Sequence, residues 1–147
     1  MIPEHFRKCL PEANKTTAAH VFKTRAKIAF EIIDFFQPEH WFLENPATAR
    51  TGDYIDESKP FFTVDYCQYG MPYRKRTKIW TNLKSFEPCL CDKQCSGWDG
   101  KKHAVRVNEL GGGSDSTING KRAVRSKVPT ELIRSLFMGV MRERKMF

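Results

Sequence analysis

The chain has 147 residues, of which 40% are hydrophobic and eleven are Phe, so it is long enough to bury the core of one domain. Its formal net charge of +8 favours a polyanionic partner, nucleic acid before an anionic membrane surface. No apolar run is long enough to span a bilayer and none resembles a signal peptide, so we expect no membrane association. The five cysteines are an odd number, and we expect an intracellular protein with reduced thiols.

The first predicted element is a helix over residues 17–36. Apolar residues recur at three- and four-residue steps from Phe22 to Phe36, which is the period of an amphipathic helix. Pro38 cannot continue a helix, so we expect the end near Gln37.

A short aromatic segment, residues 40–43, is typical of a strand that is covered on both faces. A helix, a tight turn and a buried strand form the repeating unit of a parallel α/β sheet. Ligands in such sheets bind beyond the carboxyl ends of the strands, and Glu44-Asn45-Pro46 stands at that place. The pattern therefore predicts a carboxylate at a strand end.

The rest of the α/β part, which we place at residues 16–83, holds a polar surface loop and two further strands. The loop is residues 47–60, and the strands are residues 61–66 and 78–82. Gly70-Met71-Pro72 predicts a turn between them.

Residues 84–147 are predicted to form a loop-rich extension that ends in a helix. Residues 104–107 could form a short strand, and the Gly-rich residues 111–116 indicate a flexible loop. Pro129 predicts the start of a helix that reaches about Arg142, with an apolar face of Leu132, Leu136, Phe137 and Val140.

Four candidate metal ligands lie within this extension: Cys89, Cys91, Cys95 and His103. Three thiolates and one imidazole are a ligand set that structural zinc takes, and a closed four-ligand site leaves no position for a substrate. The spacing also leaves open free thiols in a loop. Cys67, within an apolar segment, is expected to be a core residue.

Two motifs carry a resemblance when they are read in order. The first is Trp41-Phe42-Leu43-Glu44-Asn45-Pro46, and the second runs from Tyr66-Cys67-Gln68-Tyr69-Gly70-Met71-Pro72 through the basic residues Arg74 to Lys78. Together they resemble the second half of the DNA cytosine-5 methyltransferase family, in the form found in phages, viruses and some algae. The resemblance covers residues from about 28 to 83, and Val128-Pro129 with its following helix echoes the family's last block.

The resemblance implies an α/β fold with a partial Rossmann-like methyltransferase sheet. The loop-rich extension, with its candidate zinc ligands, would follow this sheet. It implies methyl transfer from S-adenosylmethionine to cytosine in DNA, with the target base flipped out of the duplex. Glu44 would contact ring nitrogen 3 as an acid, in a cleft shared with Lys75. The DNA-binding residues would be Arg74, Lys75, Arg76, Thr77 and Lys78.

The sequence departs from the family pattern in several places. Tyr73 stands where the family has Gln, and Lys75 and Thr77 stand where it has Arg. No Gly-rich cofactor turn and no Pro-Cys nucleophile precedes Glu44, while Pro88-Cys89 follows the basic motif. We therefore expect the C-terminal portion of such an enzyme, incomplete or inactive alone, with a second polypeptide to supply the first half.

Two other classes of function stay open at this point. One is a non-enzymatic, basic nucleic-acid-binding module with a structural zinc site. The other is a zinc-stabilised interaction domain that does not bind DNA.

Overall fold

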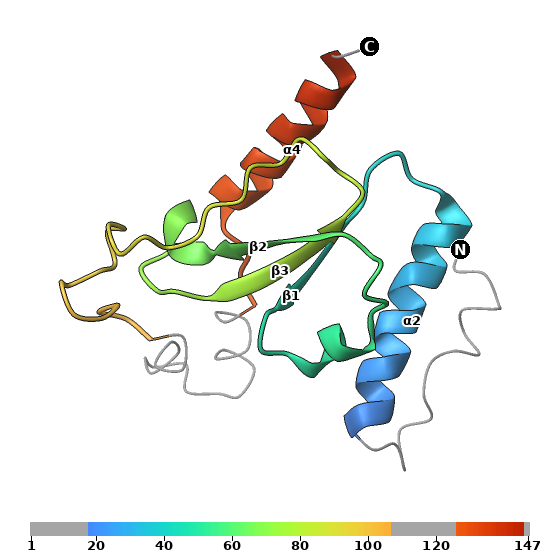
Figure 1. Cartoon of the computed structure of the whole chain (residues 1–147), viewed down its shortest axis with the longest axis horizontal. Coiled ribbons are helices and arrows are strands. Elements are labelled where there is room, and N and C mark those ends of the chain that lie inside the picture. The colour runs from blue at the N-terminus through green and yellow to red at the C-terminus, as the bar shows by residue number, and fades with distance from the viewer. Residues whose placement is uncertain (1–17, 107–125, 146–147) are drawn as a thin grey trace.

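The computed structural model describes residues 18–106 and 126–145. Two long helices and three strands make up this part of the chain (Figure 1). In chain order the elements are α2 (Ala18–Phe36), β1 (Phe42–Pro46), the 3-10 helix η1 (Arg50–Tyr54), β2 (Phe61–Asp65), the 3-10 helix η2 (Tyr66–Tyr69), β3 (Arg76–Thr81) and α4 (Thr130–Lys145).

The strands form one sheet in the order β1-β3-β2, and β3 pairs antiparallel with both neighbours. The parallel sheet that the sequence predicts is therefore wrong for these strands. Only residues 66–75 join β2 to β3, which is shorter than the crossover of about a dozen residues that a parallel pair needs. β1 and β2 do run in the same direction, but β3 lies between them.

Strand β1 lies further along the chain than the aromatic pattern predicts. It begins at Phe42 and includes Glu44, which lies opposite Ile79 in the middle of the ladder. The Glu44-Asn45-Pro46 segment is therefore not a turn after the strand. Pro46 is tolerated because β1 is an edge strand, where a missing N–H costs no ladder bond.

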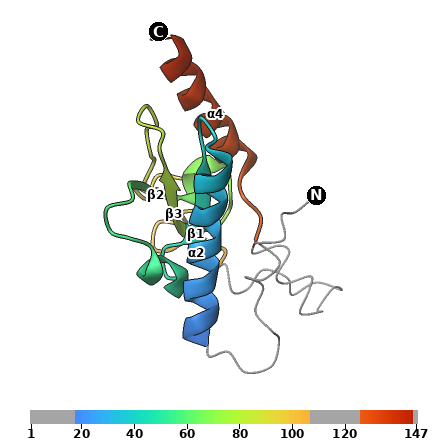
Figure 2. The ribbon, with the colours of Figure 1, turned by 90° about the vertical axis from the view of Figure 1, so that its right-hand side faces the viewer.

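Side chains alternate along each strand, and each long helix joins a hydrophobic cluster on a different face of the sheet. Helix α2 lies beside the sheet next to η1, and α4 runs away from the strands (Figures 1 and 2). On one face Val64 and Ile79 pack with Leu132 and Leu136 of α4. On the other face Trp80 forms a buried cluster with Ala26 of α2 and Ile55. The partly buried residues that pack against this cluster are Phe30, Trp41, Leu43 and Tyr54.

Both predicted helices are present. α2 ends at Phe36, one residue before the expected end, and Gln37 has a positive φ of 45°. α4 follows Pro129 and buries Leu132, Leu136 and Val140, but Phe137 from the predicted apolar face is 62% exposed.

A carboxylate of α4 anchors this helix to the loop after β3. Glu143 Oε1 accepts hydrogen bonds from the backbone N–H groups of Lys84 and Ser85, and from the Ser85 hydroxyl at 3.1 Å. These bonds hold the pKa of Glu143 below its usual value.

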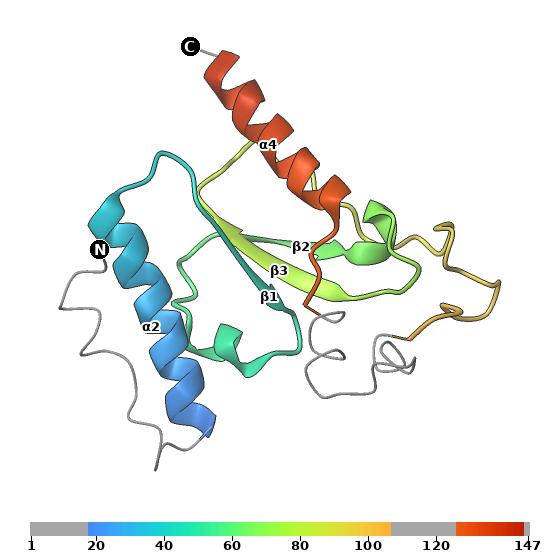
Figure 3. The same ribbon diagram turned by 180° about the vertical axis from the view of Figure 1, so that it is seen from behind.

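After β3 the chain first passes α4 and then runs to the end of the sheet that lies away from α2 (Figures 1 and 3). Residues 104–106 do not form the predicted strand, and Val105 makes one isolated bridge with Tyr73. The predicted Gly-rich loop at 111–116 lies outside the described residues. Within the described ranges, neither α2 nor α4 is long and apolar enough to cross a membrane.

Candidate active site and metal cluster

Glu44 and Lys75 come together on the α4 side of the sheet, although 31 positions separate them in the sequence. Lys75 Nζ donates to Glu44 Oε1 at 3.3 Å, and the Tyr66 hydroxyl donates to the same oxygen at 2.8 Å. The Lys75 ammonium also lies 4.7 Å from the centre of the Tyr66 ring. Both bonds engage the same carboxylate oxygen, Oε1.

Tyr66 is a functional candidate that the sequence pattern does not single out. It directly follows β2, where the sequence predicts the last residue of a buried strand, and its side chain is fully buried. Burial, together with the hydrogen bond to Glu44, raises the pKa of Tyr66 well above its usual value. The phenol therefore stays protonated and serves as a fixed donor to the carboxylate.

A hollow of about 210 Å³ opens beside Glu44, between β1 and α4. Glu44 is the one ionisable residue of its lining, which otherwise consists of Phe42, Ile79, Val128, Leu132, Ile133, Leu136 and Phe137. An apolar hollow with one carboxylate at its edge suits an uncharged ligand that offers hydrogen-bonding groups on one side.

A larger hollow, of about 440 Å³, lies on the opposite face of the sheet. Lys78 is one of its lining residues, and Lys78 Nζ lies 4.5 Å from the centre of the Phe61 ring. Asp53, Asp56 and Glu57 also line this hollow. Because these three carboxylates outnumber the two lysines of the lining, Lys59 and Lys78, the hollow is a poor place for DNA phosphates.

Asp65 organises the cationic end of the sheet. Its buried carboxylate accepts a bidentate pair of bonds from Arg76, at 3.1 and 2.8 Å, and lies 3.2 Å from Arg74 Nε. The Cys91 backbone N–H donates to it as well, at 2.9 Å. Burial by itself raises the pKa of Asp65, but the bonds from Arg76, Cys91 and Arg74 outweigh burial and leave the pKa below its usual value.

The basic run from Arg74 to Lys78 does not form one surface. Arg74 and Arg76 are 42% and 44% exposed at the side chain, although both are also bound to Asp65. Thr77 is fully buried and cannot contact DNA, which corrects its place among the predicted DNA-binding residues. The reason is strand alternation, which places Thr77 on the α4 side and Arg76 and Lys78 on the other.

Three of the four predicted metal ligands lie together in the structure, and Cys67 takes the place that the sequence assigns to Cys89. The ligand atoms of Cys67, Cys91, Cys95 and His103 all lie within 4.8 Å of one another. Cys91 Sγ lies 3.8 Å from Cys95 Sγ, and His103 Nε2 lies 3.5 and 3.3 Å from these two sulfurs.

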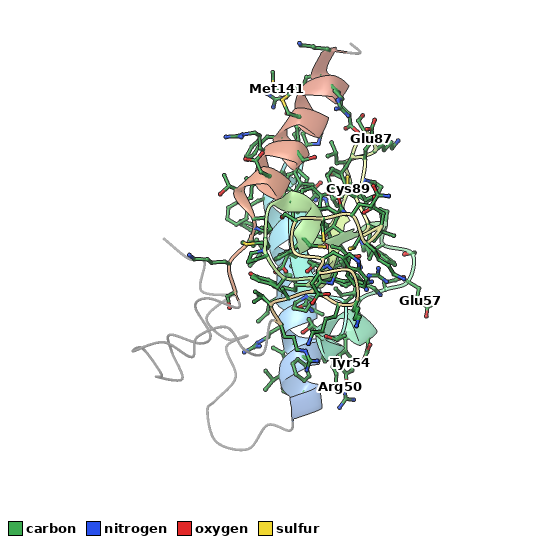
Figure 4. The ribbon with its side chains drawn as sticks, turned by 90° about the vertical axis from the view of Figure 1, so that its left-hand side faces the viewer. Arg50, Tyr54, Glu57, Glu87, Cys89 and Met141 are labelled. Atoms are coloured by element: carbon green, nitrogen blue, oxygen red, sulfur yellow. The ribbon has the colours of Figure 1, made fainter. Side chains whose placement is uncertain are left out.

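Cys89 does not belong to the cluster, and this corrects the predicted ligand set. Its side chain is exposed (labelled in Figure 4), while its backbone N–H donates to the Tyr69 hydroxyl and its carbonyl accepts from the Asp65 N–H. Cys67 replaces it from η2, a turn that the sequence pattern does not connect with the later cysteines. Cys67 is buried, as expected, and burial raises the pKa of its thiol.

A tight turn presents His103 to the cluster. Asp99 Oδ1 accepts from the backbone N–H groups of Lys101 and Lys102, and Trp98 pairs with His103 across the turn. The Trp98 and His103 rings meet edge to face at 5.4 Å.

The base of this turn packs against the turn that precedes β3. A Cβ added at Gly97 would lie 2.5 Å from the carbonyl oxygen of Pro72, which is closer than real Cβ atoms come. A glycine is therefore needed for the two turns to touch.

The comparison with known proteins gives one informative relative. The chain is 35% identical over 114 residues to a "Probable DNA (cytosine-5)-methyltransferase" of Frog virus 3 (isolate Goorha). The match covers 71% of the chain and 51% of the viral protein, so the chain spans about half of that relative's length. No family model and no solved structure matches the chain. The identity over most of its length shows that the chain is related to the DNA cytosine-5 methyltransferase family.

Proposed function

We propose that this chain is the part of a DNA cytosine-5 methyltransferase that holds the pyrimidine edge of the flipped target base. The observation that carries the proposal is the contact between Glu44, Tyr66 and Lys75 beside an apolar hollow, in a relative of a protein named for this activity. S-adenosylmethionine would be the methyl donor. Because the proposed substrate is DNA, the reaction would take place inside the cell that contains this DNA.

The chemistry at cytosine requires a group such as Glu44. Carbon 5 of cytosine is a poor nucleophile, and attack of a thiolate on carbon 6 pushes electron density toward it. The ring then needs a proton or a strong hydrogen bond at nitrogen 3, and the exocyclic amine needs an acceptor. A carboxyl group at the edge of an apolar hollow can provide both.

Tyr66 and Lys75 would be positioning residues for this carboxyl group. Because both donate to Oε1, the side chain of Glu44 is fixed while Oε2 can face the base. Lys75 is 10% exposed at the side chain, so its ammonium acts close to the site and not as a surface charge.

The DNA backbone would lie along the cationic end of the sheet. Arg74 and Arg76 are fixed by Asp65 and still partly exposed, which suits phosphate contacts that do not read sequence. The net charge of +8 supports the same partner. Lys78 faces the acidic hollow on the other side and is the weaker candidate.

The nucleophile and the cofactor turn would come from protein outside these residues, such as a second polypeptide. Exposed apolar residues of α4 that do not line the hollow offer a surface for it: Met138 and Met141. The proposed occupant is the other half of the methyltransferase, because the chain spans only about half of the viral relative.

A methyl-transfer assay with labelled S-adenosylmethionine tests this proposal. The chain alone should transfer no label to DNA, but it should bind duplex DNA with an affinity that falls as salt rises. Addition of the part of the frog virus 3 relative that the chain does not cover should give labelled 5-methylcytosine. Transfer by the chain alone would contradict the proposal that the nucleophile and the cofactor turn come from another polypeptide.

The second candidate function is a nucleic-acid-binding module without turnover. The buried Asp65 with its two arginines favours it, because this arrangement builds a cationic surface that needs no active site. The same assay separates the two functions, since the module would bind DNA in a salt-dependent way and stay inactive with any complementing half.

A further inference from the structure

We propose that Cys67, Cys91, Cys95 and His103 hold one structural zinc ion, with Cys67 and not Cys89 as the third thiolate. The proposal goes beyond methyl transfer, because it concerns an ion that the reaction does not use. The four ligand atoms come from three separate segments of the chain and lie within 4.8 Å of one another.

The distances between these atoms fit a tetrahedral ion. Zn–S bonds of about 2.3 Å and Zn–N bonds of about 2.0–2.1 Å at tetrahedral angles place two sulfurs about 3.8 Å apart and a sulfur and a nitrogen about 3.6 Å apart. The Cys91 and Cys95 sulfurs are separated by 3.8 Å, and His103 Nε2 lies 3.5 and 3.3 Å from them. The separation of the sulfurs is also far too long for a disulfide, which needs about 2.05 Å.

The surroundings of the cluster are those of a built site. The Lys93 backbone N–H points at Cys91 Sγ from 3.4 Å, and Trp98 packs against the His103 ring. Three soft sulfurs with one imidazole select zinc over hard cations such as magnesium or calcium. Four protein ligands also close the site, so the ion would have a structural role.

The ion would fix the cationic end of the sheet. Cys67 belongs to η2, which directly follows Asp65, and the Cys91 N–H donates to the Asp65 carboxylate. One bound ion would therefore join η2, the loop with Cys91 and Cys95, and the turn with His103. Without it, we expect the loop to separate from η2 and the support of Arg74 and Arg76 to weaken.

The test uses the full chain, purified under reducing conditions without chelator. Elemental analysis should find about one zinc per chain. Replacement of zinc by cobalt(II) should give the visible bands of a tetrahedral site and a sulfur-to-cobalt charge-transfer band whose intensity reports the number of thiolates.

Two matched variants decide which cysteine is the ligand. Cys89→Ser should keep one metal per chain and the full charge-transfer intensity, because Cys89 is exposed and outside the cluster. Cys95→Ser should lower that intensity by about one third or abolish tight binding. Cys67→Ser should do the same if it folds, and if it does not fold the Cys89 variant still decides.

Two results would overturn the proposal. One is a reduced, folded chain that binds no zinc or cobalt. The other is a Cys89→Ser variant that loses the metal, which would restore the ligand set predicted from sequence spacing. Neither result bears on methyl transfer, so the zinc site and the proposed function fail separately.

Discussion

At the residue scale, one buried carboxylate, that of Asp65, supports the two arginines of the cationic surface. Arg74 and Arg76 donate to it, and the Cys91 N–H completes its set of partners. Glu44 has a comparable arrangement with Tyr66 and Lys75. The sequence motifs assign roles to Glu44, Lys75 and the arginines, but they assign none to Asp65, and none to Tyr66 although it begins the second motif. Their importance depends on burial and on partners that only the fold brings near.

Asp65→Asn should lower the free energy of unfolding by about 1.5–3 kcal/mol at neutral pH, which is the net contribution of hydrogen bonds to charged groups. The folded-state pKa of Asp65 is below its unfolded value, so its contribution is present above pH of about 3.9 and is lost as pH falls through the folded pKa. Denaturant unfolding measured from pH 7 downward should show a smaller acid-side loss for the variant.

Asp53→Asn is the matched control for this substitution. Asp53 makes an exposed pair with Arg50 at 3.9 Å, and such pairs contribute less than about 1 kcal/mol. Equal effects of the two substitutions would show that the Asp65 network does not stabilise the fold.

At the scale of elements, local pattern predicts the two helices well and the sheet less well. The period of apolar residues gives α2 and α4 nearly to their ends, because each helix buries one continuous stripe. The strands are short, and their pairing depends on connections. Residues 66–75 are too few for a crossover, so β2 and β3 pair antiparallel where a parallel unit is predicted. The same turn carries Cys67 to the later cysteines, which linear spacing cannot show.

Gly97→Ala tests how the cysteine-containing loop packs against the turn before β3. The added Cβ would meet backbone atoms of Pro72 at 2.5 and 3.0 Å, so one of the two turns must move. We expect a loss of about 1–3 kcal/mol of stability, the usual cost of overpacking, and weaker metal binding. Thermal unfolding and metal titration measure the two effects.

Gly139→Ala is the comparison for this variant. Its Cβ would meet a flexible methyl group of Leu83 at 2.8 Å, and alanine gains about 1 kcal/mol over glycine inside a helix. The change should be within about 1 kcal/mol of zero. An equal loss in both variants would mean that the close approach of Gly97 to Pro72 has no special role.

At the scale of the whole molecule, the candidate active site and the cationic surface lie on different parts of the sheet. The α4 face holds Glu44 and its apolar hollow, while the cationic end joins the sheet to the cysteine cluster. The family resemblance is visible in two linear motifs, and the viral relative confirms it over 71% of the chain. The sequence cannot show that the basic run splits between faces, because that follows from the register of β3.

The most direct test of the central claim is the methyl-transfer rate of Glu44→Gln in the enzyme reconstituted with the missing half. Glutamine keeps the size of the side chain and can donate a hydrogen bond, but it cannot transfer a proton. The rate should fall about 100- to 10,000-fold, the range of general acid–base assistance, while DNA affinity is unchanged. Glu57→Gln, whose side chain points away from the molecule in Figure 4, should keep the full rate. A Glu44→Gln enzyme as fast as the Glu57→Gln control would contradict the assignment of Glu44 to the target cytosine.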